Sequence, residues 1–555
     1  MKNNLILQIF TFLSFTVFGQ NEYPKDFFAN PVEFKMSIAG TFGELRSNHF
    51  HSGIDIKTKQ KINIPIHASQ DGYVSRIKVS TYGFGKALYI NHPNGFTTVY
   101  AHLERFNHNI QTKTKSKQYE KESFEIDFGL SSNEIRVKKG EIIGFSGNTG
   151  SSTAPHLHFE IRNTKTQKVI NPMLFGLPIL DRTYPIINSI LIYHDNDKKE
   201  LIETKRISDN QYELAYKPAI SNPFNIAINT YDLLDAAPNK NGVYAIELYI
   251  NDSLYFSNKM TTFSFSETRY INSHIDYEYY RNNGLKFQKC FLELNNQIST
   301  NQKHTKYKIG QLSTTNEYTI KIIVKDSYEN SSILNFKINI TNSKGEKYIK
   351  NDTLTTEPTI NAQQVFEFKH DEFEIYIPNN SLYKNYPFKY EKIIDSLMTF
   401  PTYQILHDSI PSHKSFIVSI KSSELPVELR EKALIGRILD SDIHCIKSQW
   451  KENKIIGKSN KFGAFSIVID TIKPNIEYED IQDNSIQFQI SDELSGIKKY
   501  RGEIDGHWIL MEYDFKTKLL KYDFQQPPKQ KKQMLNLSVS DYAGNTESIN
   551  IEFFR

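Results

Sequence analysis

Histidine and aspartate side chains gather at three places within the first 160 residues, in patterns that metal sites use. His51-Ser52-Gly53-Ile54-Asp55 sets an imidazole and a carboxylate four positions apart. His156-Leu157-His158 puts two imidazoles on one face of an expected strand, because strand side chains alternate. His102 follows another apolar expected strand. Since zinc favours imidazole and carboxylate ligands and a catalytic site uses three of them plus water, these residues could hold one zinc ion.

The histidine patterns alone leave several assignments open. The chain contains 16 histidines, and most histidines in proteins are surface residues or hydrogen-bonded core residues. A second His-x-His, His49-Phe50-His51, shows that this spacing also arises without an evident role for its first member. The neighbouring glycines and the order of the motifs therefore have to indicate which histidines have a functional role.

The motifs follow one another in an order that resembles a known family. The chain carries, in sequence, His51-x-Gly-x-Asp55, Tyr100-x-His102-Leu103, Val137 to Gly144, Gly147-Asn148-Thr149-Gly150 and Pro155-His156-Leu157-His158-Phe159-Glu160. Together these segments resemble the lysostaphin-type (LytM-like) zinc endopeptidases, which cut peptidoglycan cross-links. The resemblance covers about residues 35–172, roughly a quarter of the chain.

The resemblance implies a role for each of the five residues. His51, Asp55 and His158 would be the zinc ligands, and His102 and His156 would be the catalytic pair without a metal bond. One histidine of the pair would accept a proton from a metal-activated water, and the other would stabilise the oxyanion or protonate the leaving amine. The sequence does not assign the two tasks.

Three further residues are candidates for the groove or for support of the ligands. Glu160 shares strand-face parity with His158, so it could orient that ligand, with a structural or rim glutamate as the alternative. Tyr82 would face the groove by the same resemblance, although the glycines around it also explain a tight hairpin. Asn148, in the Gly-Asn-Thr-Gly run, is the third candidate.

The elements that must position these residues are short strands. Gly72 to Val79, Ala87 to Ile90 and Thr97 to Tyr100 are apolar stretches bounded by turn signals such as Asn94-Gly95, which predicts antiparallel strands. Only Tyr390 to Met398 and Pro426 to Leu434 have helical patterns. We therefore expect a mostly β protein, with an antiparallel LytM-like peptidase β domain followed by several β-sandwich domains.

The C-terminal two-thirds contains a weak internal repeat. Ile322 to Asp326 followed by Tyr328-Glu329-Asn330 resembles Ser538 to Asp541 followed by Ala543-Gly544-Asn545. Both resemble the Asp-x-x-Gly-Asn strand pairs of bacterial immunoglobulin-like modules. The expected division is a signal peptide at 1–19, the peptidase domain at 20–180 with an insertion at about 104–136, one or two sandwiches at 181–345, a linker at 346–364, a β-rich module at 365–473 and an immunoglobulin-like sandwich at 474–555.

The insertion separates His102 from the motif that begins near Lys138. Its segment Gln111 to Glu122 is rich in lysine, which is typical of a solvated surface. The alternative is a flap that narrows the groove or contacts anionic glycan. The short lead before His51 leaves little chain for an inhibitory pro-segment, and inhibition by the C-terminal modules stays open.

Composition excludes several classes of protein. At roughly 150 residues per domain, 555 residues predict three to five domains. Lys+Arg 67 against Asp+Glu 63 is too balanced for nucleic-acid binding by bulk charge. Two cysteines exclude a disulfide scaffold and a multi-cysteine zinc ribbon. Cys290 and Cys445 fall in different expected domains, so we predict buried free thiols.

The first residues resemble a secretory signal peptide. Lys2 precedes the interrupted apolar run Leu5 to Phe18, and Gly19 suits cleavage before Gln20. A membrane anchor is the alternative, but the run is short for a span, and no later apolar stretch is long enough for a transmembrane segment. We therefore expect an exported protein in the periplasm, the cell envelope or at the cell surface.

The sequence predicts a zinc metalloendopeptidase that hydrolyses peptidoglycan cross-links. The D-alanyl-diaminopimelate link is favoured over a glycine bridge because no Gram-positive wall-binding module is recognised. One alternative is a non-catalytic LytM-like regulator, which a lost ligand would favour, and none is lost. Another is an envelope scaffold or adhesin that binds a wall partner through its β tail. A lipoyl-type carrier with its hairpin at Lys139-Gly140 would leave the His/Asp set unexplained.

Overall fold

The structure, a computed structural model, contains four β modules that follow one another along the chain. It describes residues 23–194, 198–220, 223–235, 237–305, 307–311, 317–340, 358–394, 398–422, 425–439, 442–482, 484–524 and 531–554. The expected signal peptide and most of the expected linker at 346–364 lie outside these ranges. No helix of the described residues has the length and apolar character needed to cross a membrane.

The first module is one antiparallel sheet with the main strand order β1-β2-β10-β6-β5-β4-β7. Its strands are β1 (Ile38–Gly40), β2 (Ile54–Lys57), β3 (Pro65–His67), β4 (Gly72–Val79), β5 (Lys86–Asn91), β6 (Phe96–Phe106), β7 (Ile126–Gly129), β8 (Arg136–Val137), β9 (Ile142–Ser146), β10 (His156–Asn163) and β11 (Val169–Ile170). Its helices are α1 (His108–Lys121) and the 3-10 turn η1 (Pro172–Phe175). The predicted strands at 72–79, 87–90 and 97–100 are confirmed as β4 and parts of β5 and β6.

Alternating side chains give the first module its core. Ile54 and Ile56 of β2 and Leu157 and Phe159 of β10 are fully buried, and Tyr100 of β6 packs edge-to-face on Phe159. Because strand side chains alternate, the intervening Asp55 and His158 lie on the opposite face. The packing of the core thus fixes which face of the sheet carries the polar residues.

The second module is an 11-stranded sheet in the order β16-β15-β12-β13-β14-β23-β22-β17-β18-β21, with β20 beside β15. Its strands are β12 (Ile186–Tyr193), β13 (Lys199–Arg206), β14 (Gln211–Leu214), β15 (Asn225–Leu234), β16 (Ala237–Asn241), β17 (Ala245–Ile250), β18 (Ser253–Lys259), β20 (Gln288–Lys289), β21 (Asn301–Lys303), β22 (Glu317–Lys325) and β23 (Ser331–Asn339). Its helices are η2 (Thr268–Tyr270), α2 (Ile271–His274) and α3 (Tyr277–Asn283). β19 (Thr262–Phe263) leaves this module and pairs with β11 of the first.

The third module contains two five-stranded sheets, β25-β26-β30-β34-β33 and β28-β29-β35-β31-β32, and the short pair β24-β27. Its elements are β24 (Thr359–Ile360), β25 (Phe366–His370), β26 (Phe373–Ile377), β27 (Tyr386–Pro387), β28 (Tyr390–Ile393), β29 (Thr402–Ile405), β30 (Pro411–Lys421), α4 (Val427–Arg430), β31 (Ala433–Leu439), β32 (Asp442–Ile446), β33 (Ser448–Lys451), β34 (Lys454–Lys461) and β35 (Gly463–Ile469). One buried cluster between the sheets includes Phe373, Tyr403, Phe416 and Phe465, so the module is a sandwich.

The fourth module contains two four-stranded sheets, β36-β37-β41-β40 and β39-β38-β42-β43. Its strands are β36 (Asn475–Gln482), β37 (Ser485–Ser491), β38 (Ile497–Ile504), β39 (His507–Ile509), β40 (Glu512–Asp514), β41 (Leu519–Asp523), β42 (Lys532–Asp541) and β43 (Thr546–Phe554). Phe488, Leu520, Leu535 and Val539 share one buried cluster. The mostly β architecture predicted from the sequence is confirmed in all four modules.

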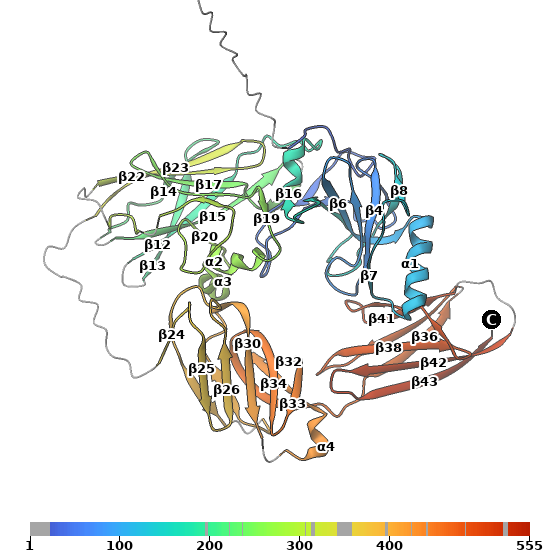
Figure 1. The fold of residues 1–555 in the computed structure, drawn as a ribbon. Helices are drawn as coiled ribbons and strands as arrows, with labels where there is room; N and C mark the ends of the chain where they lie inside the picture. The colour runs from blue at the N-terminus through green and yellow to red at the C-terminus, as the bar shows by residue number, and fades with distance from the viewer. Residues whose placement is uncertain are drawn as a thin grey trace, which may run out of the picture.

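The fourth module returns to the first, so the chain is arranged as a ring (Figure 1). Arg501 of β38 forms a 2.7 Å ion pair with Glu122 at the end of α1. Trp508 of β39 packs edge-to-face on Tyr119 of the same helix, with 5.2 Å between ring centroids. Arg269 of the second module donates to a backbone carbonyl of the third, at Ser412. These contacts join the fourth module to the first and the second module to the third.

Two helix expectations differ from the structure. Residues 390–393 form β28, because pairing with β29 and packing of Tyr390 against Phe373 outweigh the local helical pattern. Helix α1 was not expected at all. Its buried face is Ile110, Thr114 and Gln118, and only the first is apolar, so the sequence shows no apolar period of 3.6. The short helix expected at 426–434 is reduced to α4, and β31 begins at Ala433.

The two cysteines are free thiols in different modules, as predicted. Cys290 is buried in the second module, and burial raises the pKa of its thiol to about 12. Cys445 of β32 is half-buried rather than fully buried. Neither lies at the site described next.

Candidate metal centre

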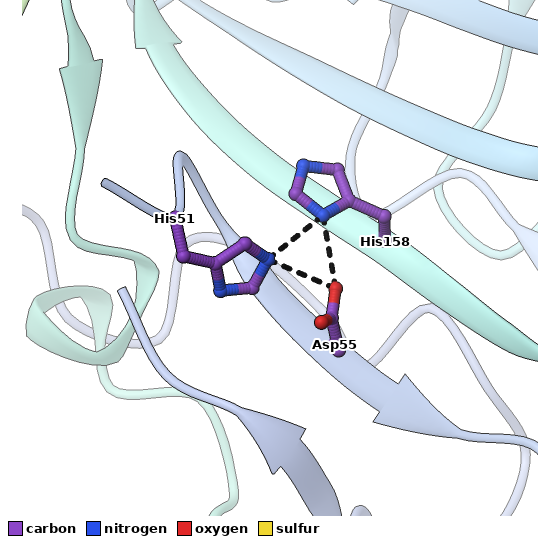
Figure 2. Close-up of side chains that lie close together, drawn as sticks. All are labelled: His51, Asp55 and His158. Carbon is purple, nitrogen blue, oxygen red and sulfur yellow. Dashed lines mark hydrogen bonds and ion pairs between the residues drawn. The ribbon is translucent and has the colours of Figure 1, made fainter. Parts of the chain in front are cut away.

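β2 and β10 hold the predicted metal ligands face to face. The strands are antiparallel neighbours, and His158 of β10 lies directly opposite Asp55 of β2. His51 comes from the loop before β2, where its backbone N–H donates to the Glu44 carbonyl at 3.0 Å. Figure 2 shows the three side chains converging on one point. The fold thus brings together three residues that lie up to 107 positions apart.

The distances among the three ligand atoms suit a single zinc ion. Asp55 Oδ1 lies 3.0 Å from His51 Nε2 and 2.9 Å from His158 Nδ1, and the two nitrogens are 3.1 Å apart. Donors placed about 2.0–2.1 Å from a tetrahedral zinc ion lie about 3.3 Å from one another. Two neutral imidazoles and one carboxylate are also a ligand set that zinc prefers. The residues present therefore fit the metal that the sequence predicted.

Hydrogen bonds fix which nitrogen each histidine presents. His51 Nδ1 lies 2.7 Å from the Thr41 carbonyl oxygen, which can only accept, so Nδ1 carries the hydrogen and Nε2 has the free lone pair. His158 Nε2 lies 3.1 Å from Glu160 Oε1, so this nitrogen donates and Nδ1 faces the cluster. Both imidazoles thus present a lone pair to the same point.

Glu160 is itself buried and paired. The side chain is fully buried, and Arg162 Nε donates to its Oε2 at 2.6 Å. Burial favours the neutral acid, but the charges of Arg162 and His158 outweigh it and lower the pKa of Glu160 to about 2. Glu160 is therefore ionised at neutral pH and contacts His158 on the side away from Asp55, as a residue that orients His158 would.

The electrostatics of the ligand cluster favour a cation. Burial alone would lower the pKa of His158, but its hydrogen bonds to Asp55 and Glu160 raise the pKa to about 9. Burial would likewise raise the pKa of Asp55, and the three surrounding histidines hold it well below its usual range. In the metal-free protein the cluster therefore keeps a proton at neutral pH, which a metal ion would displace.

His102 and His156 flank the three ligands. Their ring centroids are 4.8 Å apart, and His156 Nε2 lies 3.3 Å from Asp55 Oδ1. His102 Nδ1 donates to the Thr149 carbonyl at 2.8 Å, and His156 Nδ1 donates to the Ala154 carbonyl at 2.8 Å. Nε2 is therefore the acceptor atom of His102, whereas Nε2 of His156 is turned toward the Asp55 carboxylate. Burial, with smaller contributions from His158 and His156, lowers the pKa of His102 to about 3, so this ring is neutral at pH 7.

The backbone at His102 is unusual for a strand residue. Its φ is +60°, in the left-handed region that non-glycine residues seldom occupy. A hydrogen bond from its N–H to the Phe84 carbonyl at 2.9 Å holds this conformation, next to a register shift between β5 and β6. Such backbone strain concentrates at functional sites, because there the side-chain direction matters more than the backbone energy.

Two glycines of the motifs allow close approach of the backbone. A Cβ on Gly53 would lie 2.3 Å from the Phe159 carbonyl oxygen, so any side chain there would push β10 away from the His51 loop. Gly150 has a φ of +71°, and its Cβ would lie 2.3 Å from the Gly83 carbonyl oxygen. The loop at 147–154 carries both carbonyls that hold His102 and His156, so its path decides their orientation.

The sequence analysis missed two arginines and a backbone carbonyl that support the site. Arg46 Nη2 donates to Asp55 Oδ2 at 2.9 Å and leaves Oδ1 for the metal. Arg162 holds Glu160, and its spacing of two from Glu160 on one strand could have indicated this pair. The contacts of Arg46 and of the Thr41 carbonyl depend on a loop that folds back, which no local pattern encodes. His49 is exposed and takes no part.

The fourth module contacts the other two predicted groove residues. Tyr82 packs on Phe515, with 4.4 Å between ring centroids. Lys516 Nζ donates to the Asn148 carbonyl and, at 3.1 Å, to the Ser152 carbonyl. Lys86, which is buried, forms a 2.7 Å ion pair with Glu512. A hairpin of the fourth module thus lies against the loop that orients the two histidines.

The predicted insertion faces the same module. Helix α1 and the residue after it carry Tyr119 and Glu122, which contact Trp508 and Arg501. Asn107 caps the helix by accepting from the Ile110 N–H at 3.0 Å, and Gln118 donates to the Phe124 carbonyl at 2.7 Å. The lysine-rich segment is therefore an ordered helix in contact with the fourth module.

Comparisons with known proteins agree with this site. Peptidase family M23 matches residues 49–120 and 127–172. The DD-carboxypeptidase/endopeptidase Mpg of Neisseria meningitidis serogroup B is 35% identical over 139 residues, which are 25% of this chain and 26% of that protein. The peptidoglycan DD-endopeptidase ShyA of Vibrio cholerae serotype O1 is 30% identical over 158 residues, 27% of this chain and 31% of that protein. The first module is therefore similar to peptidase family M23 domains.

The chain spans about a quarter to a third of the length of these relatives. The catalytic domain of lysostaphin from Staphylococcus simulans is 26% identical, covers 25% of this chain and 92% of its own, and has a TM-score of 0.20. A Zu5-like domain matches residues 357–470, which is the third module. The first and third modules thus resemble two different domain types.

Proposed function

We propose that the protein is a zinc-dependent endopeptidase that hydrolyses peptide cross-links of peptidoglycan. The observation that carries the proposal is the convergence of His51 Nε2, Asp55 Oδ1 and His158 Nδ1 within 3.1 Å, flanked by His102 and His156. The printed names of the relatives, a DD-carboxypeptidase/endopeptidase and a peptidoglycan DD-endopeptidase, support the substrate class.

A zinc ion held by His51, Asp55 and His158 would acidify a water molecule and polarise the carbonyl of the scissile peptide bond. His102 is suited to accept the proton of that water, because its Nε2 is unprotonated at neutral pH and its Nδ1 is fixed on the Thr149 carbonyl. His156 is oriented by Ala154 and lies closer to Asp55. We assign it the developing oxyanion or the leaving amine.

Arg46 and Glu160 would keep the ligands in place. Arg46 binds the second oxygen of Asp55, so the carboxylate stays monodentate. Glu160 holds the hydrogen of His158 at Nε2 and increases the basicity of the ligand nitrogen. These two contacts would preorganise the centre before a substrate arrives.

We favour the D-alanyl-diaminopimelate cross-link over a glycine bridge. One relative is named a DD-carboxypeptidase/endopeptidase and the other a peptidoglycan DD-endopeptidase, and DD describes a bond between two D-centres. Cleavage of such a substrate requires export, so we also propose that residues 1–19 are a signal peptide and that the protein acts in the cell envelope.

Substitution of single residues tests the proposal. His158→Ala and Asp55→Ala should lose zinc and hydrolysis of a purified cross-linked muropeptide together. His102→Ala should retain one zinc per chain, measured by mass spectrometry of the metal, while kcat falls about 100-fold or more. His49→Ala, an exposed neighbour of a ligand, is the matched control and should match the wild type. If zinc-loaded wild type cleaves neither cross-link type, the proposal is wrong.

A further inference from the structure

A second cluster of acidic side chains lies outside the peptidase domain. Ligand oxygens of Asp181, Asp232 and Asp326 lie within 4.8 Å of one another. Their side chains are 7%, 1% and 1% exposed. Asp181 precedes β12, Asp232 is on β15 and Asp326 follows β22, so three separate segments of the second module contribute one carboxylate each.

Two of these carboxylates have an oxygen without a partner. Asp181 Oδ1 accepts from the Thr183 hydroxyl and N–H, whereas its Oδ2 is buried and unpartnered. Asp232 Oδ1 is also buried and unpartnered. Among the described residues, no lysine, arginine or histidine forms an ion pair with the three carboxylates, and the nearby Arg182 binds Asp235 instead. The ionised form of buried carboxyls without a basic partner is unfavourable, and a bound cation would offset that cost.

A neighbouring amide supplies a fourth free oxygen. Asn241 is 2% exposed and is the cross-strand partner of Asp232, so the two side chains share a face of the β15-β16 pair. Its Nδ2 donates to the Asn239 carbonyl at 3.0 Å, which fixes the orientation of the amide. Its Oδ1 is buried and has no hydrogen-bond partner. The buried Asn241 Oδ1 thus lacks a partner independently of the three carboxylates.

We propose that Asp181, Asp232, Asp326 and Asn241 bind one Ca²⁺ ion. The set contains only oxygen donors, which excludes a preference for zinc. Ca²⁺ accepts several protein oxygens at about 2.3–2.6 Å, so its ligands lie no more than about 5 Å apart, and the ligand oxygens of the three aspartates lie within 4.8 Å of one another. Mg²⁺ usually retains several of its waters, for which a buried cluster of this size has little room.

The site lies at the joint between the first two modules. Asp181 belongs to the segment that connects them, and the turn after Asp326 touches the first module, where Asn171 Nδ2 donates to the Ser327 hydroxyl at 3.1 Å. Tyr328 of the same turn packs against the core of the first module. Bound Ca²⁺ would therefore stiffen this joint and set the orientation of the peptidase domain within the ring.

The fourth module contains a related but weaker arrangement. Asn545 Nδ2 donates to the Asp541 side chain and to the Asp470 carbonyl, as Asn330 does with Asp326 and the Asp181 carbonyl. The third carboxylate of this second cluster is that of Asp492, which is partly exposed. No unpartnered buried oxygen occurs at this second cluster among the described residues, so the proposal covers only the first.

Calcium titration of the full mature chain tests the proposal. The protein is stripped with a chelator, dialysed and titrated with CaCl₂ and, separately, MgCl₂ in a calorimeter. Wild type should bind Ca²⁺ in preference to Mg²⁺, and its Tm should rise with the Ca²⁺ concentration. Asp232→Asn, which keeps the side-chain shape, should lose one equivalent or weaken it at least tenfold. Its Tm without Ca²⁺ should not fall below that of wild type, because the substitution replaces a buried ionisable group that has no basic partner with a neutral one of the same shape.

A matched control and a second measurement complete the test. Asp252→Asn removes a charge from the same module at a side chain that is 87% exposed, and it should bind Ca²⁺ as wild type does. Crystals of the wild type grown with Ca²⁺ should show an anomalous peak among the four ligands, which does not depend on any variant folding. Absence of that peak, no binding up to about 10 mM Ca²⁺, or unchanged binding by Asp232→Asn would overturn the proposal.

Discussion

The charge of Glu160 can be removed with little change in shape, so Glu160→Gln tests how the metal centre is supported. The glutamine oxygen can still accept from His158 Nε2, now 3.1 Å from Oε1. Two things are lost: the negative charge that makes His158 a stronger ligand, and the charge partner of the buried Arg162. Zinc should therefore bind more weakly while the ligand set stays intact.

The expected size follows from the geometry. Substitution of a group that holds a ligating histidine typically weakens metal binding 10- to 100-fold. That range corresponds to about 1.4–2.7 kcal/mol of binding free energy. Glu160 is fully buried and contacts His158 directly, so its charge is little screened, and we expect the upper half of the range.

Competition for zinc with a chromogenic chelator measures this loss. Glu120→Gln, an exposed glutamate on α1 that pairs with Lys117, makes the same chemical change away from the metal and should bind zinc as wild type does. Circular dichroism and Tm establish that both variants are folded. A folded Glu160→Gln variant whose zinc affinity is within twofold of wild type would refute the assignment of Glu160 as the support of His158.

Three further predictions concern other contacts. Lys516→Met should lower kcat by up to about 100-fold with zinc content unchanged, because Lys516 Nζ holds the loop that orients the two histidines proposed as catalytic. Lys521→Met is the control, and an unchanged kcat of Lys516→Met contradicts this prediction. Gly53→Ala should lower the free energy of unfolding by about 1–3 kcal/mol in urea and also lower the zinc content, because the new Cβ would lie 2.3 Å from the Phe159 carbonyl oxygen. A variant as stable as the wild type would exclude this close approach. Burial lowers the pKa of His274 from 6.5 to about 4 in the folded state, so the unfolded chain binds more protons between these two pH values. The free energy of unfolding should therefore fall by about 3 kcal/mol as the pH drops from 6.5 to 4. His274→Gln should flatten this decline, and an unchanged decline in the variant contradicts the prediction.

The structure brings together the three residues that the sequence proposes as metal ligands, because the information that places them is local or periodic. Asp55 and His158 lie on strands whose neighbouring residues are apolar, and strict alternation determines which side chains share a face. Glu160 could be proposed as a support for His158 by the same reasoning, because the two residues are two positions apart on one strand and share a face. The role of Arg46 could not be predicted in this way, because its contact with Asp55 depends on a loop that returns to the sheet.

Helix α1 shows where sequence patterns fail. Its buried positions include Thr114 and Gln118, which bury polar side chains by bonding to the Ile110 and Phe124 carbonyls. A search for apolar periodicity does not detect such a face. The opposite error occurred at Tyr390, where stacking on aromatic residues of other strands decides the conformation.

The return of the fourth module onto the first could not be predicted either. The pairs that join them, such as Lys86 with Glu512 and Tyr82 with Phe515, are separated by more than 400 residues in the chain. No composition or spacing signal reports contacts at that separation. The structure thus adds a hairpin beside the loop at 147–154, close to the residues that the sequence proposes as ligands.

Digestion of purified cell-wall sacculi most directly tests whether this protein is a zinc-dependent peptidoglycan endopeptidase. The full mature chain is stripped of metal, and muropeptides are quantified by mass spectrometry before and after one equivalent of zinc is restored. We predict that cross-linked dimers are converted to monomers only after zinc is restored, and not by His158→Ala. Equal conversion by the stripped protein, or no conversion by the zinc-loaded protein on walls of both cross-link types, would contradict the account.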